Sequence, residues 1–328
     1  MLRKIILFIA VATITAFFVQ FISPKTHQNI PVIAITQIIE HNTLDVVREG
    51  IFMGLKERGF EDGKNVRIVY QNAHGQMTTA AQIVQHFANL KPKVLVALST
   101  QSAQLLQPMA QQQNIPLIFS AVTDPVAAKL LKSVTVATPG ITGVSDYMDP
   151  LPQINMMKAF LPSLKTLGVL YNPSEINSTL FLYGAFKKAA VTEKIELVFS
   201  PLNNTSEVVS ATRALLGKVD AIYFPNDNTA MAAVSSIVSV AHKENIPVFA
   251  NDKASVERGA LAALAYNRIQ MGKDTAALIV DALKEGAALT KQTKVGGAIQ
   301  TIINKKTLEA LKLKVPASVK NFIFVEGE

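Results

Sequence analysis

The chain has 328 residues, of which 49% are hydrophobic and 17% are charged, so it can bury one large core or two and is not intrinsically disordered. The absence of cysteine excludes disulfides, thiolate metal sites, iron–sulfur clusters, a cysteine nucleophile and a lipid-modified cysteine. The net charge of +8 would suit nucleic acid, but the basic residues are scattered and form no dense run with aromatic residues, so we expect no nucleic-acid partner.

The first predicted element is an apolar run from Ile5 to Ile22 that follows two basic residues, a pattern typical of a membrane-inserting segment. The run ends with bulky Phe21 and is followed closely by Pro24, so it lacks the small residues that a signal-peptide cleavage site needs. We therefore expect residues 1–29 to form a signal-like, uncleaved membrane anchor that leaves the rest of the chain outside the cytoplasm. A cleaved signal peptide and a buried core helix are the alternatives.

From Ile30 onward, short β-branched runs alternate with longer segments of helical period, the pattern of βαβ units around a parallel sheet. The first half predicts, in chain order, Val32–Ile38 (strand), Leu44–Arg58 (helix), Val66–Tyr70 (strand), Thr79–Leu90 (helix), Val94–Leu98 (strand), Ala103–Gln112 (helix) and Pro116–Ser120 (strand). The second half repeats this order with Leu167–Tyr171, Thr179–Lys194, Glu196–Ser200, Glu207–Leu216, Ala221–Pro225, Thr229–Glu244 and Pro247–Ala250. These elements predict an α/β fold of two doubly wound parallel-sheet lobes with a hinge.

Two segments are predicted to connect the lobes, a strand-like stretch at 140–146 and a return crossing at 261–267, before a helix at 271–283. We therefore expect a first lobe over residues 30–145, to which residues 268–290 return, and a second lobe over residues 146–267. Residues 291–328 are expected to form a C-terminal tail that packs near the hinge, with one short strand from Ala298 to Ile303.

The common nucleotide-binding, metalloprotease and serine-hydrolase motifs are all missing from the sequence. The five histidines are dispersed without ligand spacing, and most are expected to be solvated at the surface. We therefore predict no metal site, no cofactor, no catalytic triad and no enzymatic activity.

Polar residues follow the predicted strands at their carboxyl ends, where open α/β sheets bind ligands. Ser99, Thr100, Gln101 and Ser102 follow the third strand and begin a helix, so they either cap that helix or hold a ligand carboxylate. The other candidate ligand-binding residues are Thr123, Asp124, Asp146, Tyr147, Tyr171, Asn172, Ser174, Glu175, Asn177, Asp227, Asn228 and Asp252.

One lobe thus offers hydroxyl and N–H donors while the other offers carboxylates, a division that suits a zwitterion such as an amino acid. Asp227 or Asp252 is predicted to pair with the ligand's ammonium group. Tyr147 and Tyr171 are predicted to flank its ring, with ordinary packing or turn roles as the alternative for each of these residues.

Six polar clusters occur together in the chain, namely residues 71–75, 99–104, 122–125, 143–146, 171–178 and 227–229. From about Ile33 to about Leu313 they closely resemble the ABC transporter substrate-binding proteins of the tryptophan/tyrosine-binding type. The resemblance implies a type I periplasmic binding protein fold that closes on a small-molecule ligand, an aromatic amino acid in some members, and presents it to an ABC permease. Two departures are Gln76, where the family often has Asp, and the missing lipobox cysteine, which shifts the tether to the N-terminal helix.

The leading hypothesis is therefore the substrate-binding component of an ABC importer, at the periplasmic or extracytoplasmic face and tethered to the inner membrane. A ligand-sensing regulator with the same two-lobe fold is the first alternative, although DNA-binding members need a helix-turn-helix ahead of the first lobe. A two-domain α/β enzyme is the second alternative.

Overall fold

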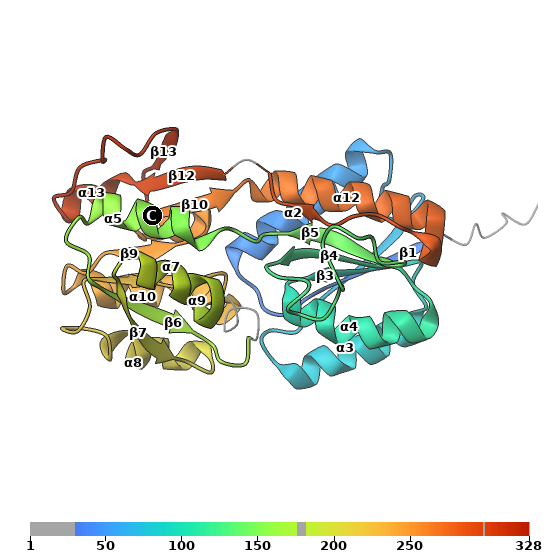
Figure 1. The fold of residues 1–328 in the computed structure, drawn as a ribbon. Helices are drawn as coiled ribbons and strands as arrows, with labels where there is room; N and C mark the ends of the chain where they lie inside the picture. The colour runs from blue at the N-terminus through green and yellow to red at the C-terminus, as the bar shows by residue number, and fades with distance from the viewer. Residues whose placement is uncertain (1–29, 176–181, 298, 328) are drawn as a thin grey trace, which may run out of the picture.

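The computed structural model describes residues 30–175, 182–297 and 299–327, and it shows two α/β lobes side by side (Figure 1). The predicted two-lobe architecture with parallel sheets is confirmed. The predicted membrane anchor over residues 1–29 lies outside the described residues. Within the three described ranges, no helix combines the length and the apolar character needed to span a bilayer.

The first lobe is built on a six-stranded sheet whose neighbouring strands are all parallel. In spatial order its strands are β11 (Lys294–Val295), β5 (Ile141–Ser145), β4 (Leu117–Val122), β3 (Val94–Leu98), β1 (Val32–Gln37) and β2 (Arg67–Asn72). Helices α2 (Asn42–Glu57) and α12 (Arg268–Glu285), the latter followed by η3 (Gly286–Ala288), cover one face, and α3 (Met77–Leu90) and α4 (Thr100–Gln113) cover the other. Successive side chains of β1 point to opposite faces of the sheet: Ile33 and Ile35 pack with α2 and α12, whereas Ala34 belongs to the core beneath α3 and α4.

Helix α12 returns to the first lobe by packing tightly against α2, and glycines allow this approach. A Cβ atom at Gly50 would lie 2.4 Å from the Ile269 carbonyl oxygen, and one at Gly272 would lie 2.2 Å from the Val47 carbonyl oxygen. Any larger residue at either position would push the two helices apart. This contact holds the start of α12, and with it Arg268, against helix α2 of the first lobe.

The second lobe is built on a seven-stranded sheet. In spatial order its strands are β13 (Phe322–Val325), β12 (Ile299–Asn304), β10 (Ala262–Tyr266), β9 (Val248–Ala250), β8 (Ala221–Tyr223), β6 (Thr166–Tyr171) and β7 (Glu196–Pro201). Only the β10–β12 pair is antiparallel among the pairings described. One face of this sheet is covered by α5 (Pro150–Phe160), the π-helix η1 (Leu182–Phe186), α7 (Lys187–Thr192) and α13 (Lys305–Ala310). The other face is covered by η2 (Thr205–Glu207), α8 (Val208–Arg213), α9 (Asn228–Ala232), α10 (Val234–His242) and α11 (Lys253–Glu257).

The chain passes between the lobes after β5, after β10 and after β11. The Tyr266 hydroxyl donates to the Tyr147 carbonyl oxygen at 2.7 Å, and the Gly296 N–H donates to the Ser145 carbonyl oxygen at 2.8 Å, so the passing segments are bonded to one another. The C-terminal segment expected near the hinge is divided by the structure, because β11 extends the first sheet while β12 and β13 extend the second.

Local differences from the predicted elements occur mainly in the second lobe. The helix predicted over 229–244 is two helices, α9 and α10, because the backbone leaves the helical region at Ala233 (φ −113°, ψ 20°). The helix predicted over 207–216 is a 3-10 turn followed by the short α8. Part of the helix predicted over 179–194 lies outside the described residues, and its described part begins as a π-helix.

Candidate ligand-binding site

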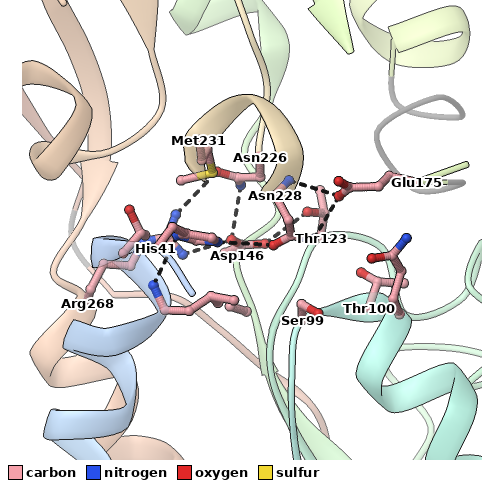
Figure 2. Close-up of a pocket in the computed structure, with 14 residues that line it drawn as sticks. His41, Ser99, Thr100, Thr123, Asp146, Glu175, Asn226, Asn228, Met231 and Arg268 are labelled. Atoms are coloured by element: carbon pink, nitrogen blue, oxygen red, sulfur yellow. Dashed lines mark hydrogen bonds and ion pairs between the residues drawn. The ribbon is translucent and has the colours of Figure 1, made fainter. Parts of the chain in front are cut away.

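A small cavity lies where the carboxyl ends of the strands of both lobes meet (Figure 2). Its walls come from the segments that follow β1, β3, β4, β5, β6 and β8 and from the first residue of α12. The lining residues are His41, Thr43, Leu44, Ser99, Thr100, Gln101, Ala121, Thr123, Asp146, Glu175, Asn226, Asn228, Met231 and Arg268.

The first-lobe wall contains the N-terminus of α4. Ser99 precedes this helix, is 2% exposed, and has φ 82° and ψ 164°, a backbone conformation that is unfavourable for a residue other than glycine. Its hydroxyl oxygen has no hydrogen-bond partner among the described residues, and no side chain there caps α4. The start of a helix carries partial positive charge, so this wall combines an unsatisfied hydroxyl with a field that favours an anion.

The second-lobe wall is centred on Glu175, which is held at the start of α9. One carboxylate oxygen accepts hydrogen bonds from the Asn228 backbone N–H (2.9 Å) and side-chain amide (2.7 Å). The other accepts from the Thr229 backbone N–H (2.9 Å) and hydroxyl (2.8 Å). Burial raises the pKa of the Glu175 carboxyl, although these four hydrogen bonds act in the opposite direction.

A second buried carboxylate, Asp227, supports this wall from behind. It accepts hydrogen bonds from the Asn172 N–H (2.6 Å) and the Ala230 N–H (2.9 Å), and so joins the end of β6 to the first turn of α9. Burial and then the charge of Glu175 raise the pKa of the Asp227 carboxyl well above its usual value. Among the described residues neither carboxyl group forms an ion pair with a lysine or arginine, so this side of the cavity holds two buried acidic groups without a paired cation.

The hinge side of the cavity is formed by a buried ion pair, in which Arg268 Nη1 lies 2.7 Å from Asp146 Oδ2. The Asp146 carboxylate also accepts from the Thr123 hydroxyl (3.0 Å) and the Asn226 side-chain amide (3.0 Å). Arg268 Nη2 donates to the Asn226 side-chain oxygen at 3.3 Å. Because Asp146 follows β5 and Arg268 follows β10, this ion pair joins two of the segments that connect the lobes.

Two further hydrogen bonds join the lobes directly. The Thr43 hydroxyl donates to Asp252 Oδ1 at 2.7 Å, and His41 Nε2 lies 3.2 Å from Asn228 Oδ1. Burial lowers the pKa of the His41 imidazole, so this ring is neutral near neutral pH. The lobes are therefore hydrogen-bonded to each other beside the cavity.

The structure brings many of the predicted residues together at one place. The predicted residues that line the cavity are Ser99, Thr100, Gln101, Thr123, Asp146, Glu175 and Asn228. Asn172 and Ser174 line a neighbouring space of about 430 Å³ that shares Gln101, Glu175 and Asn228 with the cavity. Asn177 lies outside the described residues.

The carboxylates predicted to meet the ligand's ammonium group do not line the cavity. Asp227 is fully buried and occupied by backbone N–H groups, as described above. Asp252 caps α11 by accepting from the Ser255 N–H (2.9 Å) and hydroxyl (2.5 Å), besides its bond to Thr43. Asp124 accepts from two backbone N–H groups of the turn that follows it. The carboxylates of Asp227, Asp252 and Asp124 thus accept hydrogen bonds from nearby backbone N–H groups. The acidic residue that lines the second-lobe side of the cavity is Glu175.

The tyrosines predicted to flank a ligand ring are also absent from the cavity lining. The Tyr171 hydroxyl lies 3.0 Å from the Tyr183 hydroxyl, and the Tyr171 ring meets the Phe199 ring edge-on at 5.8 Å. Burial raises the pKa of Tyr171 to about 12. Tyr147 is 38% exposed beside the first crossing, and Ser102 lies in a small apolar space behind α4.

Sequence reasoning missed the lining residues His41, Thr43, Leu44, Ala121, Asn226, Met231 and Arg268. The strand-end rule would have found His41 and Thr43, because they follow β1. The expectation of a solvated histidine is wrong for His41, which is 5% exposed. Nothing local marks Arg268, which reaches the cavity only because α12 starts at the second crossing.

Comparison with known proteins explains this arrangement. The profile of the family described as "ABC transporter substrate binding protein" matches residues 32–322. The chain belongs to this family. Substrate-binding proteins of this kind are extracytoplasmic, and the two-lobe α/β architecture is that of the periplasmic binding proteins.

Similar proteins include ones that bind aromatic amino acids. A "Tyrosine-binding protein" of Clostridioides difficile is 32% identical over 90% of this chain and 85% of its own length. The crystal structure of an ABC domain in complex with L-Trp, from Streptococcus pneumonia, is 30% identical, covers 90% of this chain and 99% of its own, and has a TM-score of 0.84. A conserved domain protein of Vibrio cholerae is 34% identical with the same coverage and a TM-score of 0.83.

Proposed function

We propose that this substrate-binding protein captures an aromatic amino acid between its lobes and delivers it to an ABC permease, without catalysing a reaction. The observation that carries the proposal is the pairing of two opposite walls around one cavity. On one side lies the buried hydroxyl of Ser99 at the start of α4, which has no partner in the part of the chain that the structure describes, and on the other the buried carboxyl group of Glu175. Relatives that bind tyrosine or contain L-Trp support the aromatic class of ligand.

The ligand's carboxylate is assigned to the start of α4. Ser99 Oγ can donate to a carboxylate oxygen, and the helix dipole adds attraction for its charge. A neutral ligand could accept a hydrogen bond from the Ser99 hydroxyl, but it would gain no electrostatic attraction from the dipole of α4.

The ligand's ammonium group is assigned to the side of Glu175. Glu175 and Asp227 place two buried acidic groups together without an ion-paired cation in the described residues, an arrangement that a bound ammonium group would balance. Removing the Glu175 charge should therefore weaken ligand binding by about 2 to 5 kcal/mol.

The ligand's side chain is assigned to the part of the cavity formed by Leu44, Ala121 and Met231. Apolar burial stabilises a ring there, and methionine sulfur makes favourable contacts with aromatic rings. We further propose that the two bodies that close on the ligand are residues 30–145 with 268–290, and residues 146–267.

Tryptophan fluorescence tests the proposal directly, because the chain contains no Trp. Added L-Trp should change its emission on burial in the cavity, and a panel of amino acids should raise the melting temperature of the chain. Ligand at about 100 times its Kd stabilises by about 2.7 kcal/mol. Glu175→Gln should lose this response, whereas the control Glu244→Gln, at an exposed position, should keep it. A panel in which no aromatic amino acid binds would contradict the proposal.

We also propose that residues 1–29 keep the protein on the outer face of the cytoplasmic membrane. The apolar run after a basic pair supports a tether, and no suitable cleavage site follows it. Intact-mass measurement of the protein extracted from membranes should give the uncleaved chain, and a mass starting near Lys25 would contradict this.

A further inference from the structure

The side chain of Arg268 has one donor, Nε, for which the described residues provide no acceptor. Arg268 is 7% exposed, and its Nη1 and Nη2 atoms donate to Asp146 and Asn226. Its Nε atom is buried and has no hydrogen-bond partner among the described residues. An arginine side chain can only donate hydrogen bonds, and a buried donor without an acceptor costs free energy. A ligand atom that accepts a hydrogen bond from Nε would therefore be stabilised there.

Arg268 lines the same cavity as Ser99, whose hydroxyl is the other buried side-chain atom without a hydrogen-bond partner among the described lining residues. Figure 2 shows Arg268 and Glu175 on opposite sides of this cavity, with Ser99 between them in the view. If the two charged ends of an amino acid lie near Glu175 and Ser99, its side chain extends toward Arg268. The acceptor that Nε lacks would then belong to the far end of that side chain.

We propose, on the basis of the proposed function, that Arg268 Nε donates a hydrogen bond to an oxygen at the end of the ligand's ring, so that the site selects tyrosine over phenylalanine and tryptophan. A tyrosine hydroxyl can accept from Nε. Phenylalanine offers no such atom, and the indole N–H of tryptophan is itself a donor. Binding either of these leaves the buried Nε–H unpaired, which is how a site built for a hydroxyl rejects analogues that lack it.

The neighbours of Arg268 fit a hydroxyl better than a second carboxylate. Asp146 already neutralises the guanidinium at 2.7 Å, so an added anion would leave the pair with net negative charge. Asp146 Oδ1 accepts a hydrogen bond from the Thr123 hydroxyl at 3.0 Å, and a carboxylate oxygen can accept another. A phenol that accepts from Nε can therefore also donate within the same cluster.

Calorimetric titration of the purified full-length chain with tyrosine, phenylalanine and tryptophan tests the proposal. The parent should bind tyrosine at least about tenfold more tightly than phenylalanine. In Arg268→Lys, which keeps a positive charge beside Asp146 but removes the Nε donor, this ratio should fall to about threefold or less while phenylalanine affinity stays within about threefold. Arg48→Lys is the matched control, since Arg48 pairs with Asp45 at 2.9 Å and does not line the cavity.

The ratio separates selection from a merely structural role, because a distorted cavity would weaken both ligands together. A parent that binds tyrosine and phenylalanine equally, or an Arg268→Lys variant that keeps the parent's ratio, would overturn the proposal. A parent that binds none of the three amino acids would overturn the proposed function itself, and the two failures are therefore distinguishable.

Discussion

The two walls of the cavity differ in how their polar groups are satisfied. On the first-lobe wall, the Ser99 hydroxyl is buried without a partner in the described structure, and its backbone holds φ at 82°. On the second-lobe wall, Glu175 accepts four hydrogen bonds and Asp227 accepts two from backbone N–H groups.

This difference indicates that the polar groups of one wall can serve mainly ligand binding while those of the other wall also stabilise the fold. The first-lobe wall keeps a strained residue whose hydroxyl has no partner among the described residues, and under the proposed function a ligand carboxylate would accept a hydrogen bond from it. The second-lobe wall uses its carboxylates to join β6 to α9, so its groups stabilise the lobe as well as supplying charge. Substitutions on the two walls should therefore separate into different classes of effect.

The largest expected effect is on stability, at Asp227. Asp227→Ala leaves the N–H groups of Asn172 and Ala230 without their acceptor in a buried position, which should lower the free energy of unfolding by about 2 to 4 kcal/mol. Denaturant unfolding without ligand measures it. Asp149→Ala, which removes an exposed cap of α5, should cost only about 1 kcal/mol. Equal losses in the two variants would contradict the structural role given to the second-lobe wall.

Ser99→Ala should have a smaller effect, confined to binding. Loss of the hydroxyl removes one hydrogen bond to the ligand and should weaken amino acid binding by about 1 to 2 kcal/mol, whereas the unfolding free energy should not fall, because the change removes a buried hydroxyl that has no partner among the described residues. Ser102→Ala provides the control, because its hydroxyl is equally buried and unpartnered in the described structure but lies outside the cavity lining. If Ser102→Ala weakens binding as much as Ser99→Ala, the cavity assignment is wrong.

The smallest expected effect is a proton released on binding. Because burial raises the pKa of Glu175, its carboxyl takes up a proton at a higher pH than an exposed glutamate does. A bound ammonium group favours the charged carboxylate and lowers this pKa, so affinity should rise with pH through the raised value and a fraction of a proton should leave. Calorimetry in buffers of different ionisation enthalpy measures the release, which Glu175→Gln should abolish; proton uptake would contradict the pairing.

The pH dependence of stability has the same origin. In the folded chain the pKa values of Glu175 and Asp227 are raised, so their contribution is fully present at acid pH and is lost as pH rises through the folded values. The lowered pKa of His41 acts in the opposite sense, because its contribution is present above its usual value and is lost as pH falls below it. Asp227→Asn should flatten the first of these slopes in unfolding measurements.

Several features of the fold could be predicted from the sequence because they depend on local pattern. The strand at 94–98 was predicted with the same bounds as β3, since five consecutive apolar residues between polar ones fit a strand buried on both faces. The polar residues after this strand are predicted as a cap or a ligand site, and three of the four, Ser99, Thr100 and Gln101, line the cavity at the start of α4. Helix ends were harder to predict, as the break at Ala233 shows, because no glycine or proline marks it.

The sequence by itself determined the two-lobe plan, the edge of each sheet where polar residues gather, and the kinds of donor and acceptor available there. Periodicity and strand-end composition are local properties, so they can be read along the chain. Only the tertiary structure decided which of these groups face the cavity. Asp227 and Asp252 became caps because nearby N–H groups needed acceptors, whereas Arg268 reached the site because α12 packs against α2 and begins where the chain returns to the first lobe.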